Sequence, residues 1–199
     1  MVANSIDNQV KNYLAELEKA EGSYEFQVLL ENFKQKALDD ETSVWFLFKA
    51  IIKESIESPE VFETKPSYIV GVFYILNDMD NEKSYSLLKW FIQNCSETTP
   101  MGVIELLSTL ITSFSILEFK EFYSFASSEN QAQSALGFLT LYNLLFEDRL
   151  TSEQIKKVVD LSKTYKNERY PIEHAAELIR EHFRGGEKKD SVKIDLNLI

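Results

Sequence analysis

The stretch "GVFYILN", residues 71–77, recurs in altered form as "GVIELLS", residues 102–108, and "GFLTLYN", residues 137–143. Each copy has a glycine, two apolar residues, a variable position, two large apolar or aromatic residues, and then Asn or Ser. The glycines are 31 and 35 residues apart, which is the length of a helix–turn–helix repeat. Because glycine lowers helix stability by roughly 1 kcal/mol relative to alanine, its recurrence predicts a close helix crossing at each position.

A polar turn and a second amphipathic segment follow each copy. These segments are NEKSYSLLKWFIQNC (81–95), ILEFKEFYSFASS (116–128) and TSEQIKKVVDLSKTY (151–165). Residues 66–165 are therefore predicted to form three consecutive helix pairs. The glycine segments, with Asn77 and Asn143 before the turn, resemble helices of HEAT or armadillo-type α-solenoids. The resemblance rests on spacing over about half of the chain, and it implies antiparallel helix pairs stacked in a solenoid.

The flanking regions also have helical spacing. Two opening helices are expected to break near Gly22 and Ser23, and a third helix is expected over about residues 42–57. The segment SPEVFETKPS, residues 58–67, is predicted to be a loop. The sequence thus predicts an all-α chain of about nine or ten helices in one domain, residues 1–199. Its parts are N-terminal helices (1–58), three helix pairs (66–165), a last helix from Pro171 to Arg184, and a tail (185–199).

The tail alternates apolar and polar residues from Val192 to Leu198, which is the pattern of a half-buried strand. No second strand is evident in the sequence to pair with it. We expect a short extended strap over the preceding helices. Pairing with another chain's tail or with a partner's sheet edge, and a helical turn, are the alternatives.

Composition supports a packed helical domain and disfavours some partners. Hydrophobic residues make up 44% of the 199 residues, and only six Gly and four Pro are present, which suits long helices. The formal charge is −11, so we expect no general affinity for nucleic acid or for an anionic membrane. Residues 1–148 carry a net charge of −13, whereas residues 149–199 carry +2. A basic protein is the partner that this charge favours.

Three features indicate a cytoplasmic protein. The first residues have no apolar segment of the kind found in secretory signals. The longest uncharged run, residues 131–146, is shorter than the roughly 20 apolar residues that span a bilayer, so it is interpreted as a buried helix. Cys95 is the single cysteine, which excludes an internal disulfide and fits a reducing compartment.

Candidate sites for chemistry are weak, and no cofactor or metal is predicted. His174, Glu177 and Glu181 could share one helix face, but their spacing fits a solvated face better than a metal site. The segment DMDNE, residues 78–82, lacks the glycine of a calcium loop and is interpreted as an acidic turn that caps a helix. Cys95 lies in an amphipathic segment and is interpreted as a core residue. No enzyme activity is predicted.

The strongest candidate site is an acidic surface. Between Trp90 and Asp148 there are seven acids and only Lys120 as a base, and tyrosine among carboxylates suits binding to a basic protein. The aromatic residues of LEFKEFYSF, residues 117–125, are expected to be sandwiched between helices; a surface that contacts a partner is the alternative. The predicted partner-binding residues are Asp78, Asp80, Glu82, Glu97, Glu118, Glu121, Tyr123, Glu129, Glu147 and Asp148.

The general character of the chain resembles that of bacterial immunity proteins, which are often small, cytoplasmic, acidic, helical and poor in cysteine. This resemblance implies an inhibitor whose carboxylates occupy the phosphate-binding surface of a basic toxin nuclease. A helical scaffold or adaptor with another protein partner is the first alternative. An enzyme that uses His174 and nearby carboxylates, with or without a metal, is the second.

Overall fold

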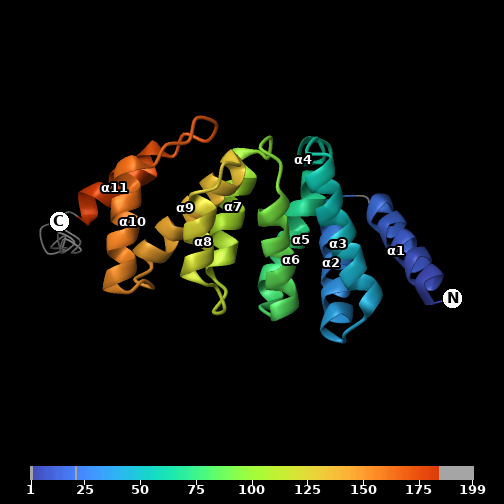
Figure 1. Cartoon of the computed structure of the whole chain (residues 1–199). Coiled ribbons are helices and arrows are strands. Elements are labelled where there is room, and N and C mark those ends of the chain that lie inside the picture. The colour runs from blue at the N-terminus through green and yellow to red at the C-terminus, as the bar shows by residue number, and fades with distance from the viewer. Residues whose placement is uncertain (1, 21, 184–199) are drawn as a thin grey trace, which may run out of the picture. The chain divides into compact units, whose positions relative to one another are not determined.

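The computed structural model describes residues 2–20 and 22–183, and every regular element in those ranges is a helix (Figure 1). The all-α class predicted from the sequence is therefore confirmed. The predicted C-terminal strap, residues 185–199, lies outside the described residues.

Eleven helices occur in the described part of the chain. Their bounds are α1 Val2–Lys19, α2 Ser23–Leu38, α3 Thr42–Glu57, α4 Val61–Thr64, α5 Pro66–Met79, α6 Glu82–Asn94, α7 Met101–Thr112, α8 Phe119–Ala126, α9 Gln131–Phe146, α10 Ser152–Thr164 and α11 Glu173–His182.

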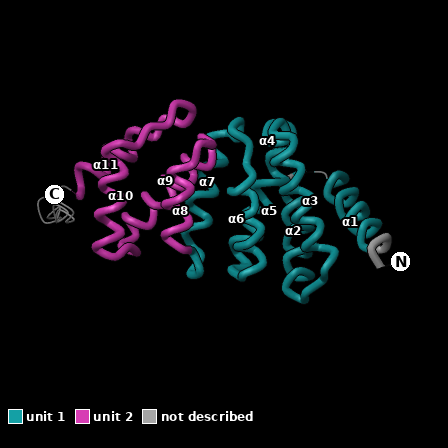
Figure 2. Tube along the Cα trace, viewed as in Figure 1, with its two compact units in different colours: residues 1–117 teal, residues 118–199 magenta. Residues whose placement is uncertain are grey.

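The chain divides into two compact units, Met1–Leu117 and Glu118–Ile199, which are called unit 1 and unit 2 (Figure 2). Unit 1 contains α1 to α7, and unit 2 contains α8 to α11. Unit 1 carries 9 basic and 18 acidic residues, and unit 2 carries 12 and 14, so unit 1 has most of the net negative charge. The single domain over residues 1–199 and the solenoid arrangement stay predictions.

Helix α3 forms the centre of unit 1. It spans the range predicted from the sequence and contacts α1, α2, α4, α5 and α6, so its wide apolar surface is covered on several sides. The rings of Phe73 and Phe91 pack edge to face with centroids 5.1 Å apart, which joins α5 to α6 in the core. This core is rich in fully buried Phe, Leu and Ile.

Helix α9 forms the centre of unit 2, and its range is the uncharged run predicted to be a buried helix. Ten of its residues are buried, and it contacts α8, α10 and α11. Phe138 stacks on Tyr165 with ring centroids 4.0 Å apart, and Phe146 meets Phe183 edge to face at 5.6 Å.

The glycines of the repeated segments have three different surroundings. A Cβ added at Gly137 would lie 2.4 Å from the backbone nitrogen of Ala126, so α9 crosses α8 at backbone contact. A Cβ added at Gly71 would lie 2.4 Å from Leu30 Cδ1, a side-chain atom of α2. A Cβ added at Gly102 would meet nothing within 4 Å. The predicted close crossing is confirmed at Gly71 and Gly137 and is wrong at Gly102.

The helix pairs follow the prediction in part. Helix α5 packs against α6, and α9 contacts α10, as expected. Helix α8 packs closely against α9, although the sequence paired it with the segment that forms α7. The expected α7–α8 pair spans the division between the two units, so the packing of these two helices is not described.

Two local predictions need correction. The predicted loop of residues 58–67 contains the short helix α4, and Pro66 begins α5, where proline fits because the first helical N–H has no intrahelical partner. The last helix begins at Glu173 with Ile172 as N-cap, so Pro171 precedes the helix instead of lying in its first turn. On α8, Phe122 is buried, whereas Phe119, Tyr123 and Phe125 are half-buried.

Candidate protein-interaction site

In unit 1, three of the predicted partner-binding residues lie together at the turn between α5 and α6. Asp78, Asp80 and Glu82 are all exposed to solvent. Asp78 forms an ion pair with Lys34 of α2, and this contact is the main reason that the pKa of Lys34 is raised. Glu97 follows α6 and is also exposed, but it lies in a separate turn.

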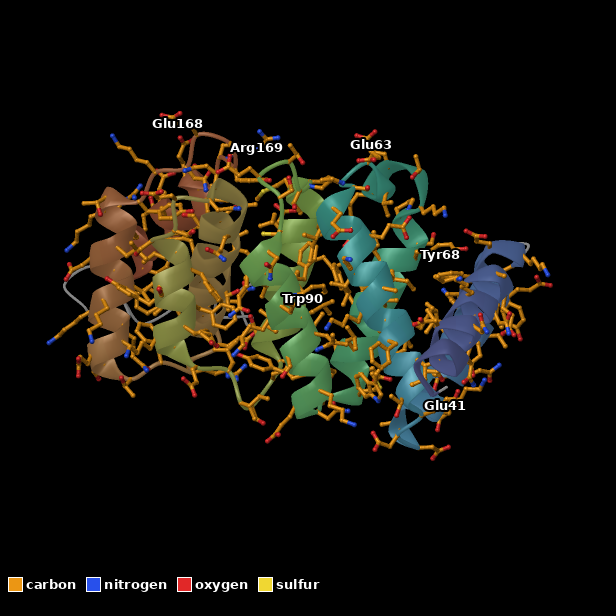
Figure 3. All side chains as sticks on the ribbon, turned by 45° about the vertical axis from the view of Figure 1, so that its right-hand side comes forward. Glu41, Glu63, Tyr68, Trp90, Glu168 and Arg169 are labelled. Carbon is orange, nitrogen blue, oxygen red and sulfur yellow. The ribbon has the colours of Figure 1, made fainter. Side chains whose placement is uncertain are left out.

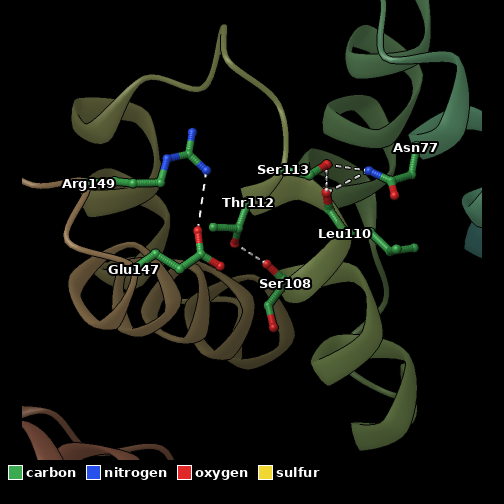
Figure 4. Close-up of polar contacts among 7 residues, drawn as sticks. All are labelled: Asn77, Ser108, Leu110, Thr112, Ser113, Glu147 and Arg149. Atoms are coloured by element: carbon green, nitrogen blue, oxygen red, sulfur yellow. Dashed lines mark hydrogen bonds and ion pairs between the residues drawn. The ribbon is translucent and has the colours of Figure 1, made fainter.

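The α5–α6 turn is tied to α7 by Asn77, the Asn that ends the first repeated segment (Figure 4). Its side-chain amide donates to the carbonyl oxygen of Leu110, at 3.0 Å, and to the hydroxyl of Ser113. Asn81 then caps α6, because its side chain accepts from Ser84 N and Ser84 Oγ accepts from Asn81 N. DMDNE is thus the end of one helix and the capped start of the next, as the sequence predicted.

In unit 2, the predicted residues lie at the two ends of the α8–α9 pair. Glu118 is the N-cap of α8, and Glu129 is in the turn before α9; both are exposed. Glu121 and Tyr123 are half-buried on α8, so they present less surface than the prediction assumed. Glu147 and Asp148 follow α9, where Glu147 forms an ion pair of 3.5 Å with Arg149 (Figure 4).

Three aspartates share an uncommon backbone conformation. Asp40, Asp80 and Asp148 have φ angles of 62°, 41° and 57°, in the left-handed region that glycine adopts most easily. Each is the exposed residue that turns the chain after a long helix, α2, α5 and α9 respectively. Asp80 and Asp148 belong to the predicted set, whereas Asp40 was missed.

Two of these turns have the same hydrogen bonds. After α2, Glu41 N donates to Lys36 O at 2.9 Å and Asp40 N donates to Ala37 O at 3.0 Å. After α9, Arg149 N donates to Leu144 O at 3.0 Å and Asp148 N donates to Leu145 O at 3.3 Å. This pair of bonds is the Schellman motif, whose left-handed position is usually Gly and sometimes Asn.

Aspartate is a poor choice at these positions for folding alone. A residue with a Cβ in the left-handed region costs about 1 kcal/mol relative to the right-handed region. A carboxylate at a helix C-terminus also meets the negative end of the helix dipole, at a further cost of about 0.3–1 kcal/mol. Strain and charge placed against stability are found where a side chain serves a function, so Asp40 and Asp80 in unit 1 and, separately, Asp148 in unit 2 are candidate functional residues.

A groove between α3 and α6 is a second feature of unit 1, with a volume of about 600 Å³. Both tryptophans of the chain, Trp45 and Trp90, line it, together with the half-exposed Phe46. Trp90 is labelled on its helix in Figure 3. Lys49 and Lys83 line it together with Asp40 and Glu82, so its lining is aromatic and carries charges of both signs.

The residues considered for chemistry are not assembled into a site. Cys95 is only 2% exposed, and burial raises the pKa of its thiol to about 12, so it is a core residue as predicted. His174, Glu177 and Glu181 are exposed on α11. Within residues 2–20 and 22–183, no group of three His, Cys, Asp or Glu side chains is placed to hold a metal ion.

Among the described residues, no helix has both the length and the apolar character needed to cross a membrane. Comparison with protein-family models, with curated proteins and with solved structures found no match.

Proposed function

We propose that the protein is an acidic protein-binding module of the cytoplasm whose partner is a basic protein. The observation that carries the proposal is the placement of Asp40, Asp80 and Asp148 at left-handed helix ends. Glycine or asparagine is the usual residue at such a helix end, so the recurring carboxylate is the feature that a function would require, although the carboxylate of Asp40 also pairs with Lys83.

The charge of unit 1 supports the same proposal. With 9 basic and 18 acidic residues, unit 1 attracts a basic partner over the Debye length of about 8 Å at physiological salt. Complementary charge of this kind mainly speeds association and selects among partners. A toxin nuclease is the partner class that the resemblance to immunity proteins implies, and the acidic turns would then occlude its phosphate-binding surface.

The test is the triple variant Asp40→Asn, Asp80→Asn and Asp148→Asn. Asparagine tolerates the left-handed conformation and removes the charge, so we expect Asp80→Asn to stabilise the protein by about 0.5 kcal/mol. Asp40→Asn gains as much at the helix end but loses the ion pair with Lys83, so we expect the triple variant to be about as stable as the wild type. We expect the same variant to lose the basic proteins that the wild-type chain captures from native lysate, as identified by mass spectrometry. Unchanged stability together with a loss of binding separates a binding surface from damage to the fold.

The matched control is the triple variant Glu54→Gln, Glu105→Gln and Glu177→Gln, which removes the same charge from exposed helix-interior positions. It should still capture the basic proteins. If the wild-type chain captures no basic protein, the proposal fails in favour of a scaffold with another kind of partner. Growth rescue on co-expression with a captured basic protein that is toxic would distinguish an inhibitor from an adaptor.

A further inference from the structure

The groove between α3 and α6 in unit 1 already holds a cation of the chain itself. The Nζ atom of Lys83 is 5.5 Å from the centroid of the Trp45 ring, which is within the range of a cation–π contact. The same Nζ atom forms an ion pair with the carboxylate of Asp40. All three residues line the groove. A carboxylate and an indole ring that share one ammonium form a cation site, which we call the Asp40–Trp45 site.

The ion pair between Lys83 and Asp40 contributes little to folding. The two side chains are 60% and 75% exposed, and ion pairs between exposed side chains add little to stability. Lys83 lies in the first turn of α6, where the positive end of the helix dipole disfavours a cation. Asp40 follows the end of α2, where the negative end of the dipole disfavours an anion. Replacing Lys83 at this site by another cation should therefore cost the fold little.

The other charges of the groove leave place for one incoming cation. The second ring, that of Trp90, has its own lysine, because the Nζ atom of Lys49 is 5.4 Å from its centroid. The acids of the lining are Asp40 and Glu82, so the lining is neutral while Lys83 is in place. Once Lys83 moves out, the two acids outnumber Lys49, and the lining becomes complementary to a single positive charge.

Arginine is the cation that such a site favours over lysine. A planar guanidinium stacks on an indole ring and can donate two parallel hydrogen bonds to one carboxylate, whereas an ammonium is a point charge that is more strongly hydrated. Phe46 also lines the groove and is 48% exposed, so the aliphatic stem of an arginine has an apolar ring to pack on. An arginine from outside is therefore a better occupant than Lys83.

We propose that Lys83 holds the place of an arginine side chain of the basic partner. When the partner binds, its guanidinium lies over Trp45 and pairs with Asp40, and Lys83 moves into solvent. This inference rests on the proposed function and deepens it, because it names the side chain through which the basic partner is recognised. It also makes Lys83 an internal competitor that weakens binding.

The test uses blocked hexa-arginine and hexa-lysine peptides, which carry the same charge, and the full-length protein at low salt. Binding is titrated by tryptophan fluorescence, since both tryptophans of the chain line the groove. We expect hexa-arginine to bind about threefold or more tightly than hexa-lysine. In two-dimensional NMR spectra the indole N–H signal of Trp45 should shift more than that of Trp90, because Lys49 stays over Trp90. The variant Trp90→Phe assigns the two signals.

Two matched pairs of variants make the test specific. Lys83→Met removes the competing cation, so it should tighten hexa-arginine binding by about threefold more than Lys53→Met does. Lys53 is the control because it is also 60% exposed and forms an exposed ion pair with Glu57, but lies outside the groove lining. Asp40→Asn should weaken hexa-arginine binding by about threefold, whereas Asp39→Asn, outside the lining, should change it by less than about twofold. All four side chains are exposed, so the variants should keep the wild-type far-ultraviolet circular dichroism.

The proposal is overturned if neither peptide binds, if hexa-lysine binds as tightly as hexa-arginine, or if Lys83→Met changes binding no more than Lys53→Met does. Binding that leaves the Trp45 signal unmoved would also overturn it. Capture of basic proteins from lysate is a separate measurement, so failure of the proposed function is distinguishable. If that capture depends on the aspartates while any of these outcomes is found, the proposed function stands and only the arginine site falls.

Discussion

The crossings at Gly71 in unit 1 and Gly137 in unit 2 come from the same sequence pattern but differ in what lies opposite the glycine. At both sites an added Cβ would approach a neighbouring atom to 2.4 Å. At Gly71 that atom is Leu30 Cδ1, the end of a flexible side chain. At Gly137 the three nearest atoms belong to Phe125 and Ala126, and two of them are backbone atoms.

The comparison shows that a distance alone does not measure how strictly a glycine is required. A side chain can change rotamer within its helix, whereas a backbone atom moves only if the whole helix moves. Gly137 is therefore required by the α8–α9 packing, and Gly71 is required only in part. Gly102, which has open space around it, is not required by any contact.

The largest effect is expected for Gly137→Ala. The new methyl group would overlap the α8 backbone, and overpacking of this kind typically costs 1–3 kcal/mol, or more where nothing can shift. Alanine recovers about 1 kcal/mol of helix propensity, which leaves a net loss of about 2 kcal/mol. Urea unfolding followed by circular dichroism measures the loss. An unchanged midpoint would mean that α8 and α9 can separate without cost, and the comparison would fail.

A smaller effect is expected at α1, which buries Tyr13 and Leu17 in unit 1 and also makes a polar contact with Glu41. The Tyr13 hydroxyl donates to Glu41 Oε1 at 2.5 Å, and this hydrogen bond is the main cause that lowers the pKa of Glu41 below its ordinary value of 4.5. The ionised carboxylate also accepts from Ser43 and lies near Lys36. We expect Glu41→Gln to destabilise the protein by about 1 kcal/mol at pH 7.

The pH dependence distinguishes this contact from the glycine crossings. A lowered pKa in the folded state means that the stabilisation is present above pH 4.5 and is lost as the pH falls through the folded-state pKa. The stability difference between wild type and Glu41→Gln should therefore shrink below pH 4.5, whereas that for Gly137→Ala should not. Urea unfolding at a series of pH values checks this, with Glu54→Gln as the charge-matched control.

The effect of Gly71→Ala is expected to be smaller still, below about 1 kcal/mol in either direction. The gain of about 1 kcal/mol in helix propensity is offset by the rearrangement of Leu30. A double-mutant cycle with Leu30→Ala sharpens the prediction. Leu30→Ala alone should cost about 2–5 kcal/mol, and Gly71→Ala should become stabilising in that background. The absence of coupling between the two changes would contradict the geometry.

The smallest effect is expected for Gly102→Ala, and it is stabilising. The residue is exposed in the first turn of α7, and nothing lies within 4 Å of the added methyl group. Alanine should stabilise the protein by about 0.5 kcal/mol through helix propensity and reduced freedom of the unfolded chain. A loss of stability in urea unfolding would show a contact at this position and would weaken the comparison.

Periodicity was enough to predict the helical class and several boundaries. The range of α3, the buried helix α9 and the capped start of α6 all follow from local signals: an apolar run, a lack of charge, and the acidic turn DMDNE, in which Asn81 supplies the cap. Helix α4 was missed because it has only four residues, too few for any periodicity to be visible.

The remaining features depend on which helices meet in space. A glycine pattern cannot show what lies opposite each glycine. Backbone atoms lie opposite Gly137, a side chain lies opposite Gly71, and the space around Gly102 is open. The groove requires Trp45 and Trp90 to come together at one cavity from helices far apart in the sequence. Asp40 could have been noticed, because it closes an apolar helical segment that has no glycine after it. Its left-handed backbone conformation, however, depends on the turn that follows.

The buried thiol of Cys95 can report how often unit 1 opens. It is the single thiol of the chain, it lies in unit 1 immediately after α6, and it is 2% exposed. Its buried, protonated thiol cannot react with a disulfide reagent until the surrounding structure opens. The rate of thiol labelling of the intact protein would therefore measure how often unit 1 opens under native conditions, with no contribution from unit 2.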